Sequence, residues 1–159
     1  METARTILEK VTESDLEDVK RLYKDPLVRK YLGGVREEVA VSAVGKDFFQ
    51  SDETSLYLTV GERDTSAFIG LVSLDPHHDG EDIEISYQLM PEWWGRGLGS
   101  EVVEAVLNTA FNEMNLTKIV AETQTANHSS CRLLEKVGMT LDRKVVRFGE
   151  EQRVYVIQV

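Results

Sequence analysis

Residues 91–100 read Pro-Glu-Trp-Trp-Gly-Arg-Gly-Leu-Gly-Ser, and a pattern typical of a helix follows at once. Three glycines in five positions, Gly95, Gly97 and Gly99, leave a run of backbone N–H groups uncovered by side chains. The helix behind them points the positive end of its dipole the same way, so the segment is suited to hold phosphate oxygens. An alternating strand over 83–89 precedes it. The order strand, glycine turn, helix indicates an α/β fold that binds a phosphorylated cofactor.

Two well-known phosphate-binding loops do not fit this stretch. A Walker loop ends in Gly-Lys-Ser/Thr, which is absent here. A dinucleotide fingerprint needs Gly-x-Gly-x-x-Gly, whereas these three glycines stand two residues apart. A tight strand-to-helix turn that binds nothing is the alternative, and a second motif is needed to decide.

That second motif reads Asn127-His-Ser-Ser-Cys-Arg-Leu-Leu-Glu-Lys-Val-Gly-Met139. Together with the stretch Pro91-x-x-Trp-Gly-Arg-Gly-Leu-Gly-Ser-Glu101, it resembles the GNAT superfamily of acyl-CoA-dependent N-acyltransferases. Within that superfamily the pair is most similar to the RimJ/RimL-type N-terminal acetyltransferases of ribosomal proteins. A weaker similarity over 25–32, Asp-Pro-Leu-Val-Arg-Lys-Tyr-Leu, extends the resemblance to nearly the whole chain.

The resemblance implies a single GNAT domain over 1–159 with a mixed, mainly antiparallel sheet of six to seven strands and helices on both faces. The apolar pattern predicts the same mixture of elements. Helices are expected over about 14–24, 36–49, 97–114 and 127–138, with a short one after Pro26. Strands are expected over 6–11, 55–61, 67–74, 81–89 and 117–123, and as a terminal hairpin over 140–148 and 153–158.

Composition bounds the class of protein. The chain has 159 residues, with 18 basic and 28 acidic side chains and a net charge of −10. An acidic surface repels nucleic acid and anionic membranes and would attract a cationic amine. Cys131 is the only cysteine, no apolar run approaches ~20 residues, and residues 1–5 carry no apolar signal core. We therefore expect a cytoplasmic protein without nucleic-acid or membrane partners.

The resemblance implies acetyl-CoA as the acyl donor. The pyrophosphate would lie on the N–H groups of the glycine turn, and Arg96 would either add charge or be solvated. Backbone groups at the end of the splayed strand would pair with the pantetheine arm, and one freed N–H would face the thioester oxygen. Asn127 would bond the arm, cap its helix, or do both. The expected cofactor-binding residues are Leu89, Met90, Trp94, Gly95, Arg96, Gly97, Leu98, Gly99, Ser100, Asn127 and Ser130.

Two catalytic residues are expected. Glu84 would deprotonate the acceptor amine directly or through a water, and a surface carboxylate is the alternative reading of this residue. Ser130 would hydrogen-bond the departing sulfur of coenzyme A. Many GNAT enzymes carry a tyrosine for that task seven residues after the asparagine, where this chain has Leu134. Glu122 and Gln124 are weaker acid–base candidates.

Several other polar residues are expected to be structural. Tyr87 and Cys131 are assigned to the core, and Glu101 to the solvent face of its helix. His77-His78-Asp79 is expected to be a solvated turn and not a metal site, because adjacent histidines diverge on a strand.

The expected reaction is direct attack of an amine on acetyl-CoA in a ternary complex. The acceptor would be a peptide N-terminus or a small amine, and the resemblance also admits a homodimer. The alternative is a non-catalytic acyl-CoA-binding sensor or interaction module, which the missing tyrosine at Leu134 favours.

Overall fold

The computed structural model describes residues 1–36, 55–77 and 79–159, so the helix expected over 36–49 falls largely outside the described residues. One sheet carries seven strands in the order β1-β2-β3-β4-β5-β7-β6. Neighbours pair antiparallel except β4 and β5, which are parallel. The strands are β1 (Thr6–Lys10), β2 (Leu56–Glu62), β3 (Phe68–Pro76), β4 (Ile83–Leu89), β5 (Lys118–Gln124), β6 (Thr140–Arg147) and β7 (Glu150–Gln158).

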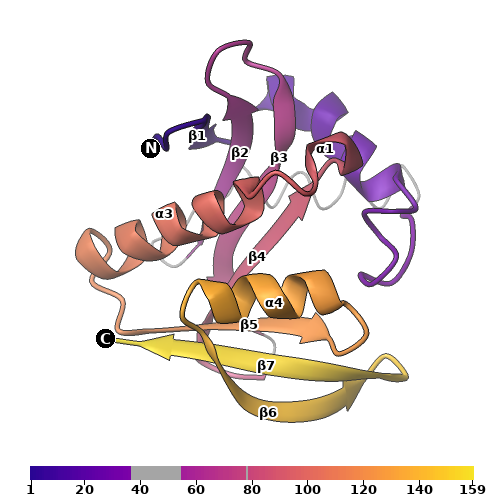
Figure 1. Cartoon of the computed structure of the whole chain (residues 1–159), viewed down its shortest axis with the longest axis vertical. Helices are drawn as coiled ribbons and strands as arrows, with labels where there is room; N and C mark the ends of the chain where they lie inside the picture. Colours follow the sequence, from indigo (N-terminus) through magenta and orange to yellow (C-terminus); the bar gives the residue numbers. More distant parts are fainter. Residues whose placement is uncertain (37–54, 78) are drawn as a thin grey trace.

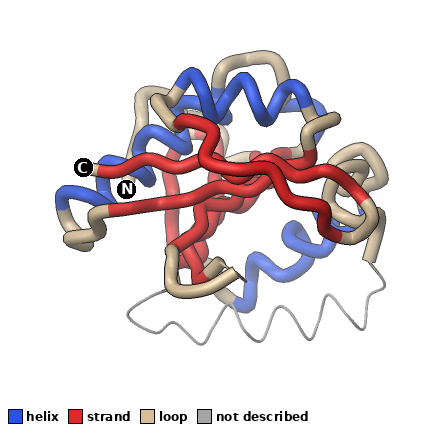
Figure 2. Tube along the Cα trace, turned by 90° about the horizontal axis from the view of Figure 1, so that it is seen from below, coloured by secondary structure: helices blue, strands red, loops and turns tan. Residues whose placement is uncertain are grey.

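Helices cover both faces of this sheet, as predicted (Figure 2). Helix α1 (Leu16–Lys24) lies on one face, and α3 (Leu98–Asn112) and α4 (His128–Lys136) lie on the other. Short 3-10 turns, η1 (Glu13–Asp15) and η2 (Pro91–Trp93), precede α1 and α3. None of the described helices has the length and apolar character needed to cross a membrane.

Each face has its own hydrophobic cluster. Under α3 the fully buried side chains of Val102, Val103 and Val106 pack with β-strand residues. Under α1, Val19 and Leu22 are fully buried in a smaller cluster. A fully buried side chain of this size contributes roughly 1.5–3 kcal/mol, so the apolar periodicity of these helices is enough to fix which side faces the sheet.

The short helix predicted after Pro26 does not form. The chain instead makes successive turns that end at Gly33 and Gly34, which have φ of 89° and 82°. Arg29 donates to the carbonyl oxygens of Leu32 and Gly34. The two glycines are in the left-handed region, and the Arg29 side chain bonds the carbonyls that a helix would use. The regular helical hydrogen-bond pattern is therefore lost.

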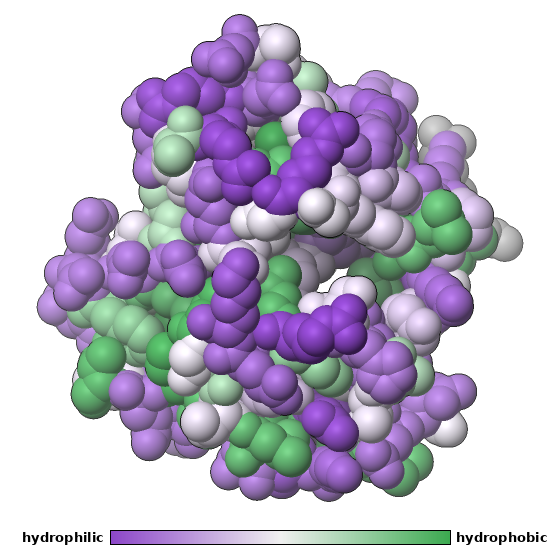
Figure 3. All heavy atoms as spheres, viewed as in Figure 1, coloured by the Kyte–Doolittle hydropathy of each residue, from purple (hydrophilic) through white to green (hydrophobic). Residues whose placement is uncertain are grey.

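Strands β4 and β5 separate soon after they meet. They pair only at Ile83 with Ile119 and at Glu84 with Val120. Beyond these two pairs the strands diverge, and α4 lies beside the gap (Figure 1). The space-filling view is hollowed at the same place (Figure 3). The splay that the sequence resemblance implied is therefore present, and we call it the β4–β5 opening.

Gly70 lets β3 approach the C-terminal end of β4 closely. A Cβ at this position would overlap the carbonyl oxygen of Gln88 and lie 2.9 Å from the Cα of Leu89. Both neighbours are backbone atoms, which cannot rotate away as a side chain can.

We expect Gly70→Ala to lower the free energy of unfolding by about 3 kcal/mol, because β3 and β4 must move apart. The melting temperature should fall by about 6–12 °C for a chain of this size. Gly61→Ala in β2 is the matched control: its Cβ would meet nothing closer than 3.8 Å, and its effect should stay below about 1 kcal/mol. Equal midpoints for the two variants in thermal denaturation would contradict this account.

Candidate functional site

The backbone groups of β4 alternate between its two neighbours. The N–H of Met90 donates to the oxygen of Ile69 on β3 at 2.8 Å, and the two residues are cross-strand partners by the register of the ladder. In an antiparallel ladder such pairs recur at every second residue. The N–H and C=O groups of even positions of β4 therefore face β3, whereas those of Tyr87 and Leu89 face the β4–β5 opening.

This alternation bears on one predicted role, that of Met90. The N–H of Met90 is used by Ile69, and its carbonyl accepts from the N–H of Trp93 at 2.9 Å. The N–H of Met90 is therefore not available as a donor to a cofactor. Its side chain is buried in the cluster under α1, which is what this residue contributes.

Trp94 ties the glycine turn to the end of β4. Its indole Nε1 donates to the carbonyl oxygen of Leu89 at 2.8 Å, although the ring itself is 48% exposed. Of the two backbone groups that Leu89 turns to the opening, the carbonyl is thus occupied. The N–H of Leu89 remains as the donor that faces the opening.

The glycine turn forms a cradle of unbonded N–H groups. Gly95 and Gly97 have φ of 74° and 77°, a conformation that exposes successive amides on one side. Within the described residues no backbone or side-chain acceptor binds the N–H groups of residues 95–100, and the first helical bond runs from Glu101 N to Gly97 O. Six amides at the N-terminus of α3 are thus unpaired donors, the arrangement that an anion such as a pyrophosphate can accept from.

Arg5 supports this cradle from outside, which no sequence motif indicated. Its Nη1 donates to the carbonyl of Arg96 at 2.8 Å, and its Nε pairs with Glu101 at 2.9 Å. Glu101 also accepts from Thr3, so this carboxylate on the outer side of α3 is partly exposed and holds the N-terminal segment. Arg96 lies over the ring of Trp93, at 4.8 Å from its centre.

Two hydroxyl groups meet across the opening. Tyr87 Oη lies 2.6 Å from Ser130 Oγ, and burial raises the pKa of Tyr87 to about 12, which keeps it protonated. Ser130 stands in the first turn of α4, where Asn127 caps the helix by accepting from the Ser130 N–H at 3.2 Å. Cys131 is buried in the core as predicted.

The assignment of Tyr87 to the core was therefore incomplete. The ring packs against the cluster under α3, but its hydroxyl reaches a polar partner. A half-buried tyrosine needs such a partner for its O–H, and this rule was the available signal.

Glu84 stands where the β4–β5 ladder breaks. Its Oε2 accepts from the N–H of Glu122 at 3.2 Å, so a side chain takes the place of the backbone acceptor that a continued ladder would supply. Burial raises the pKa of the Glu84 carboxyl to about 7, even though His77 and the Glu122 N–H act in the opposite direction.

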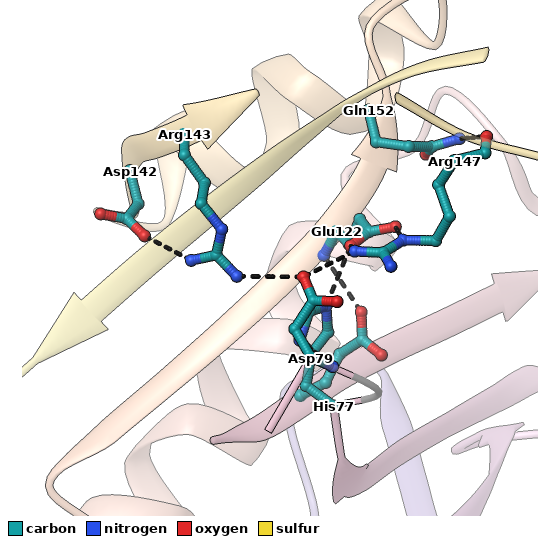
Figure 4. Close-up of polar contacts among 8 residues, drawn as sticks. His77, Asp79, Glu122, Asp142, Arg143, Arg147 and Gln152 are labelled. Atoms are coloured by element: carbon teal, nitrogen blue, oxygen red, sulfur yellow. Dashed lines mark hydrogen bonds and ion pairs between the residues drawn. The ribbon is translucent and has the colours of Figure 1, made fainter. Parts of the chain in front are cut away.

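Glu122, by contrast, belongs to an ionic network that joins β3, β5 and β6 (Figure 4). Its carboxylate is 2.9 Å from His77 Nε2 and 2.8 Å from Arg147 Nε. Burial raises the pKa of Glu122, but these partners outweigh it and lower the pKa overall. Glu122 therefore stays ionised. Of these two carboxyl groups, Glu84 is the one able to exchange a proton near neutral pH.

His77 does not lie in a solvated turn as predicted. It is 3% exposed, because the turn folds back and its ring packs against Glu122. The hydrogen bond from Arg147 holds the pKa of Asp79 well below its usual range. Potential metal-binding atoms of His77, Asp79 and Glu122 lie within 4.8 Å of one another. The Arg147 guanidinium already bonds both carboxylates, so an arginine supplies the cation of this cluster.

Comparisons with known proteins agree with this geometry. The family model of the acetyltransferase (GNAT) domain matches residues 5–140. The chain is 30% identical over 154 residues to the uncharacterized N-acetyltransferase YnaD of Bacillus subtilis, covering 94% of this chain and 89% of that protein. It is 29% identical over 146 residues to the uncharacterized N-acetyltransferase YoaA of the same organism, covering 87% and 81%.

Solved structures share the fold. A GNAT-family acetyltransferase from Bacillus anthracis superposes with a TM-score of 0.86 at 23% identity, over 99% of this chain and 97% of that one. Spermidine N-acetyltransferase from Vibrio cholerae, solved with CoA and spermine, gives a TM-score of 0.83 at 18% identity, over 96% and 95%.

The family match covers most of the chain, and the cradle, the strand opening and the helix cap stand where the two motifs placed them. GNAT acetyltransferases use acetyl-CoA as their donor. This chain belongs to the GNAT family of N-acetyltransferases.

Proposed function

We propose that this acetyltransferase joins its two substrates in the β4–β5 opening and transfers the acetyl group directly to a primary amine. A bond forms between the amine nitrogen and the acetyl carbon, and the carbon–sulfur bond breaks. The ammonium loses one proton to Glu84 through water, and the same nitrogen loses a second proton once the new bond has formed, which reaches the sulfur. The observation that carries the proposal is Glu84, a carboxyl with a pKa near 7 at the point where the opening begins.

The residues divide into a donor set and an acceptor set. The N–H groups of residues 95–100 would hold the pyrophosphate, and the Leu89 N–H would face the thioester oxygen. Asn127 would use its amide NH2 toward the pantetheine arm, because its oxygen already caps α4. Leu98 and Trp94 would shape the turn, Arg96 would add charge beside it, and Ser100 would add a hydroxyl.

The hydroxyl pair would serve the leaving group. Ser130 would donate to the sulfur, and Tyr87, 2.6 Å behind it, would donate to Ser130. A tyrosine from β4 would thus supply the function that Leu134 cannot. This arrangement favours an enzyme over the acyl-CoA sensor considered from the sequence.

The acceptor follows from acid–base matching. An α-amine has a pKa of ~8 and a lysine-type amine ~10.4, so a base that titrates near 7 is better matched to the α-amine. We therefore propose an α-amine acceptor on a small molecule or peptide, in line with a RimJ/RimL-like assignment. Incubation with acetyl-CoA and a panel of α-amines, polyamines and aminoglycosides, with release of free thiol as readout, tests this directly.

Glu84→Gln should lower kcat about 100-fold and leave the KM for acetyl-CoA nearly unchanged. The wild-type kcat should rise as pH increases through about 7, because Glu84 must lose its proton to act, and the variant should lack this rise. Glu104→Gln, an exposed carboxylate on α3, is the control with normal activity. An unchanged pH profile in Glu84→Gln would remove Glu84 from the role of base.

The same variant has a stability signature. The folded protein holds the Glu84 proton up to about pH 7, whereas an unfolded glutamate loses it near 4.5. The folded state therefore loses stability as pH rises between these values, by at most about 3 kcal/mol. Glu84→Gln should be more stable than wild type at pH 8 and show a smaller difference at pH 5 by thermal unfolding.

Gly97→Ala should raise the dissociation constant of coenzyme A about tenfold. A side chain at φ 77° costs about 1–2 kcal/mol and distorts the cradle. Gly149→Ala in the β6–β7 turn, with φ 76° and open space around it, is the matched control. It should lose similar stability without loss of affinity in a calorimetric titration. Equal affinity in both variants would show that the cradle does not bind the cofactor.

Tyr87→Phe and Ser130→Ala should each lower kcat about 10- to 100-fold, since each removes one member of the same hydroxyl chain. The double variant should be little slower than the slower single one, because paired groups act as a unit. Fully additive losses, measured as initial rates of free coenzyme A release, would argue that the two hydroxyls act separately.

A further inference from the structure

Arg29 is a buried cation without an acidic partner among the residues that the structure describes. It follows α1 and is 8% exposed. Its guanidinium donates to the carbonyls of Leu32 and Gly34 at 2.5 and 3.0 Å and to Gln88 Oε1 at 3.4 Å. These three neutral acceptors use three of its five N–H groups and leave its charge uncompensated.

A second cation approaches the same place. The Cζ atoms of Arg29 and Arg36 lie 5.0 and 5.8 Å from the centre of the Tyr23 ring. Burial lowers the pKa of Arg29, and the charge of Arg36 lowers it further. The aromatic face offsets part of this cost, but two like charges around one ring still repel. No salt bridge within 1–36, 55–77 and 79–159 includes either arginine.

The two arginines lie near the C-terminal end of β4. Gln88, which accepts from Arg29, stands between Tyr87 and Leu89, whose N–H groups face the opening. Tyr23 and Arg29 come from α1 and the turns after it, on the sheet face that carries the even positions of β4. Glu84 occupies an even position of β4 as well. We call this face of the sheet, which carries the arginines and the proposed base, the acceptor face.

The acceptor face is therefore dipolar. At its acidic end Glu84 pairs in register with Asp75 of β3, and each side chain is a carboxyl group that becomes negative when it loses its proton. At its positive end, four residues further along β4 and about 13 Å away, Arg29 donates to Gln88, and Arg36 lies against the same Tyr23 ring as Arg29. A ligand that carried only positive charge would suit one end and be repelled by the other.

We infer that the acceptor is an amine that also carries an anionic group, a carboxylate or a phosphate, and that Arg29 and Arg36 bind this group while the amine lies at the Leu89 end of β4 and loses its proton to Glu84 through water. The inference rests on the proposed acetyl transfer. A guanidinium with free N–H groups matches the planar oxygens of either anion. Amino acids, peptides with a free carboxylate and phosphorylated amines meet this requirement. Polyamines such as spermidine, named for one structural neighbour, do not.

Matched pairs of acceptors test the inference on the wild-type enzyme. Ala-Ala is compared with Ala-Ala-amide, L-alanine with L-alaninamide, and phosphoethanolamine with ethanolamine, with spermidine as a further acceptor. We expect kcat/KM to be about 10- to 100-fold higher for the anionic member of at least one pair, the gain of one charge-assisted contact. The pair with the larger ratio identifies carboxylate or phosphate as the anion.

Variants test whether the arginines cause the ratio of kcat/KM between the anionic and the neutral acceptor of a pair. Arg29→Gln should reduce the ratio to near one by raising KM for the anionic acceptor, while the neutral member keeps its rate. Because Arg29 also binds two turn carbonyls, Arg36→Gln serves as a second variant outside those contacts and should reduce the ratio about threefold or more. Arg21→Gln on the exposed side of α1 is the control with an unchanged ratio.

Three outcomes separate the possibilities. Ratios near one in all three wild-type pairs, or a preference for spermidine, would overturn the inference and leave the acetyltransferase proposal in place. An anion preference that survives both Arg29→Gln and Arg36→Gln would also overturn it. Absence of transfer to any amine, with acetyl-CoA binding intact, would instead count against the proposed function.

Discussion

The parallel pairing of β4 and β5 ends after two residue pairs, and the arrangement of the site depends on this break. A parallel ladder that stops leaves backbone donors and acceptors that must find other partners. Glu84 satisfies the N–H of Glu122, and Trp94 satisfies the carbonyl of Leu89. The Leu89 N–H is left facing the gap. The opening thus offers a ligand the backbone hydrogen-bonding groups that the interrupted sheet leaves unpaired.

Two neighbouring glutamates at the break have opposite protonation behaviour. Glu84 is desolvated, and this effect outweighs the charge of His77 and the Glu122 N–H, so its pKa rises. Glu122 is desolvated as well, but Arg147 and His77 bond its carboxylate and lower its pKa. When the pKa values of two neighbouring glutamates are shifted in opposite directions, one stays an anion and the other can accept a proton. The network also anchors β6 to β5 and to the turn that follows β3, because Arg147 of β6 bonds both Glu122 of β5 and Asp79 of that turn.

The sequence predicted the elements and the cradle because local rules govern them. Glycine spacing, the Asn127 cap and the alternation of β4 are each visible within about ten residues. It did not predict contacts between distant segments. His77 looked like part of a polar turn, yet it meets Glu122 across 45 positions of the chain. Arg5 and Arg147 carried no motif, and the similarity over 25–32 that includes Arg29 indicated no contact for it, since an arginine acquires its role only from what the fold places beside it. The bond from the Met90 N–H to Ile69 was not predicted either, because the neighbour that each backbone N–H faces depends on strand register, which spacing alone does not reveal.

The alternation along β4 has an evolutionary consequence. Odd positions such as Tyr87 and Leu89 turn their side chains to the face that carries α3 and α4, and even positions such as Gln88 turn theirs to the opposite face. Donor handling and acceptor choice, as proposed above, therefore occupy opposite sides of one strand. A point mutation at an even position alters the acceptor face and leaves the donor face chemically untouched. Descendants of one ancestral strand can diversify in the amines they accept while the coenzyme machinery stays under separate selection.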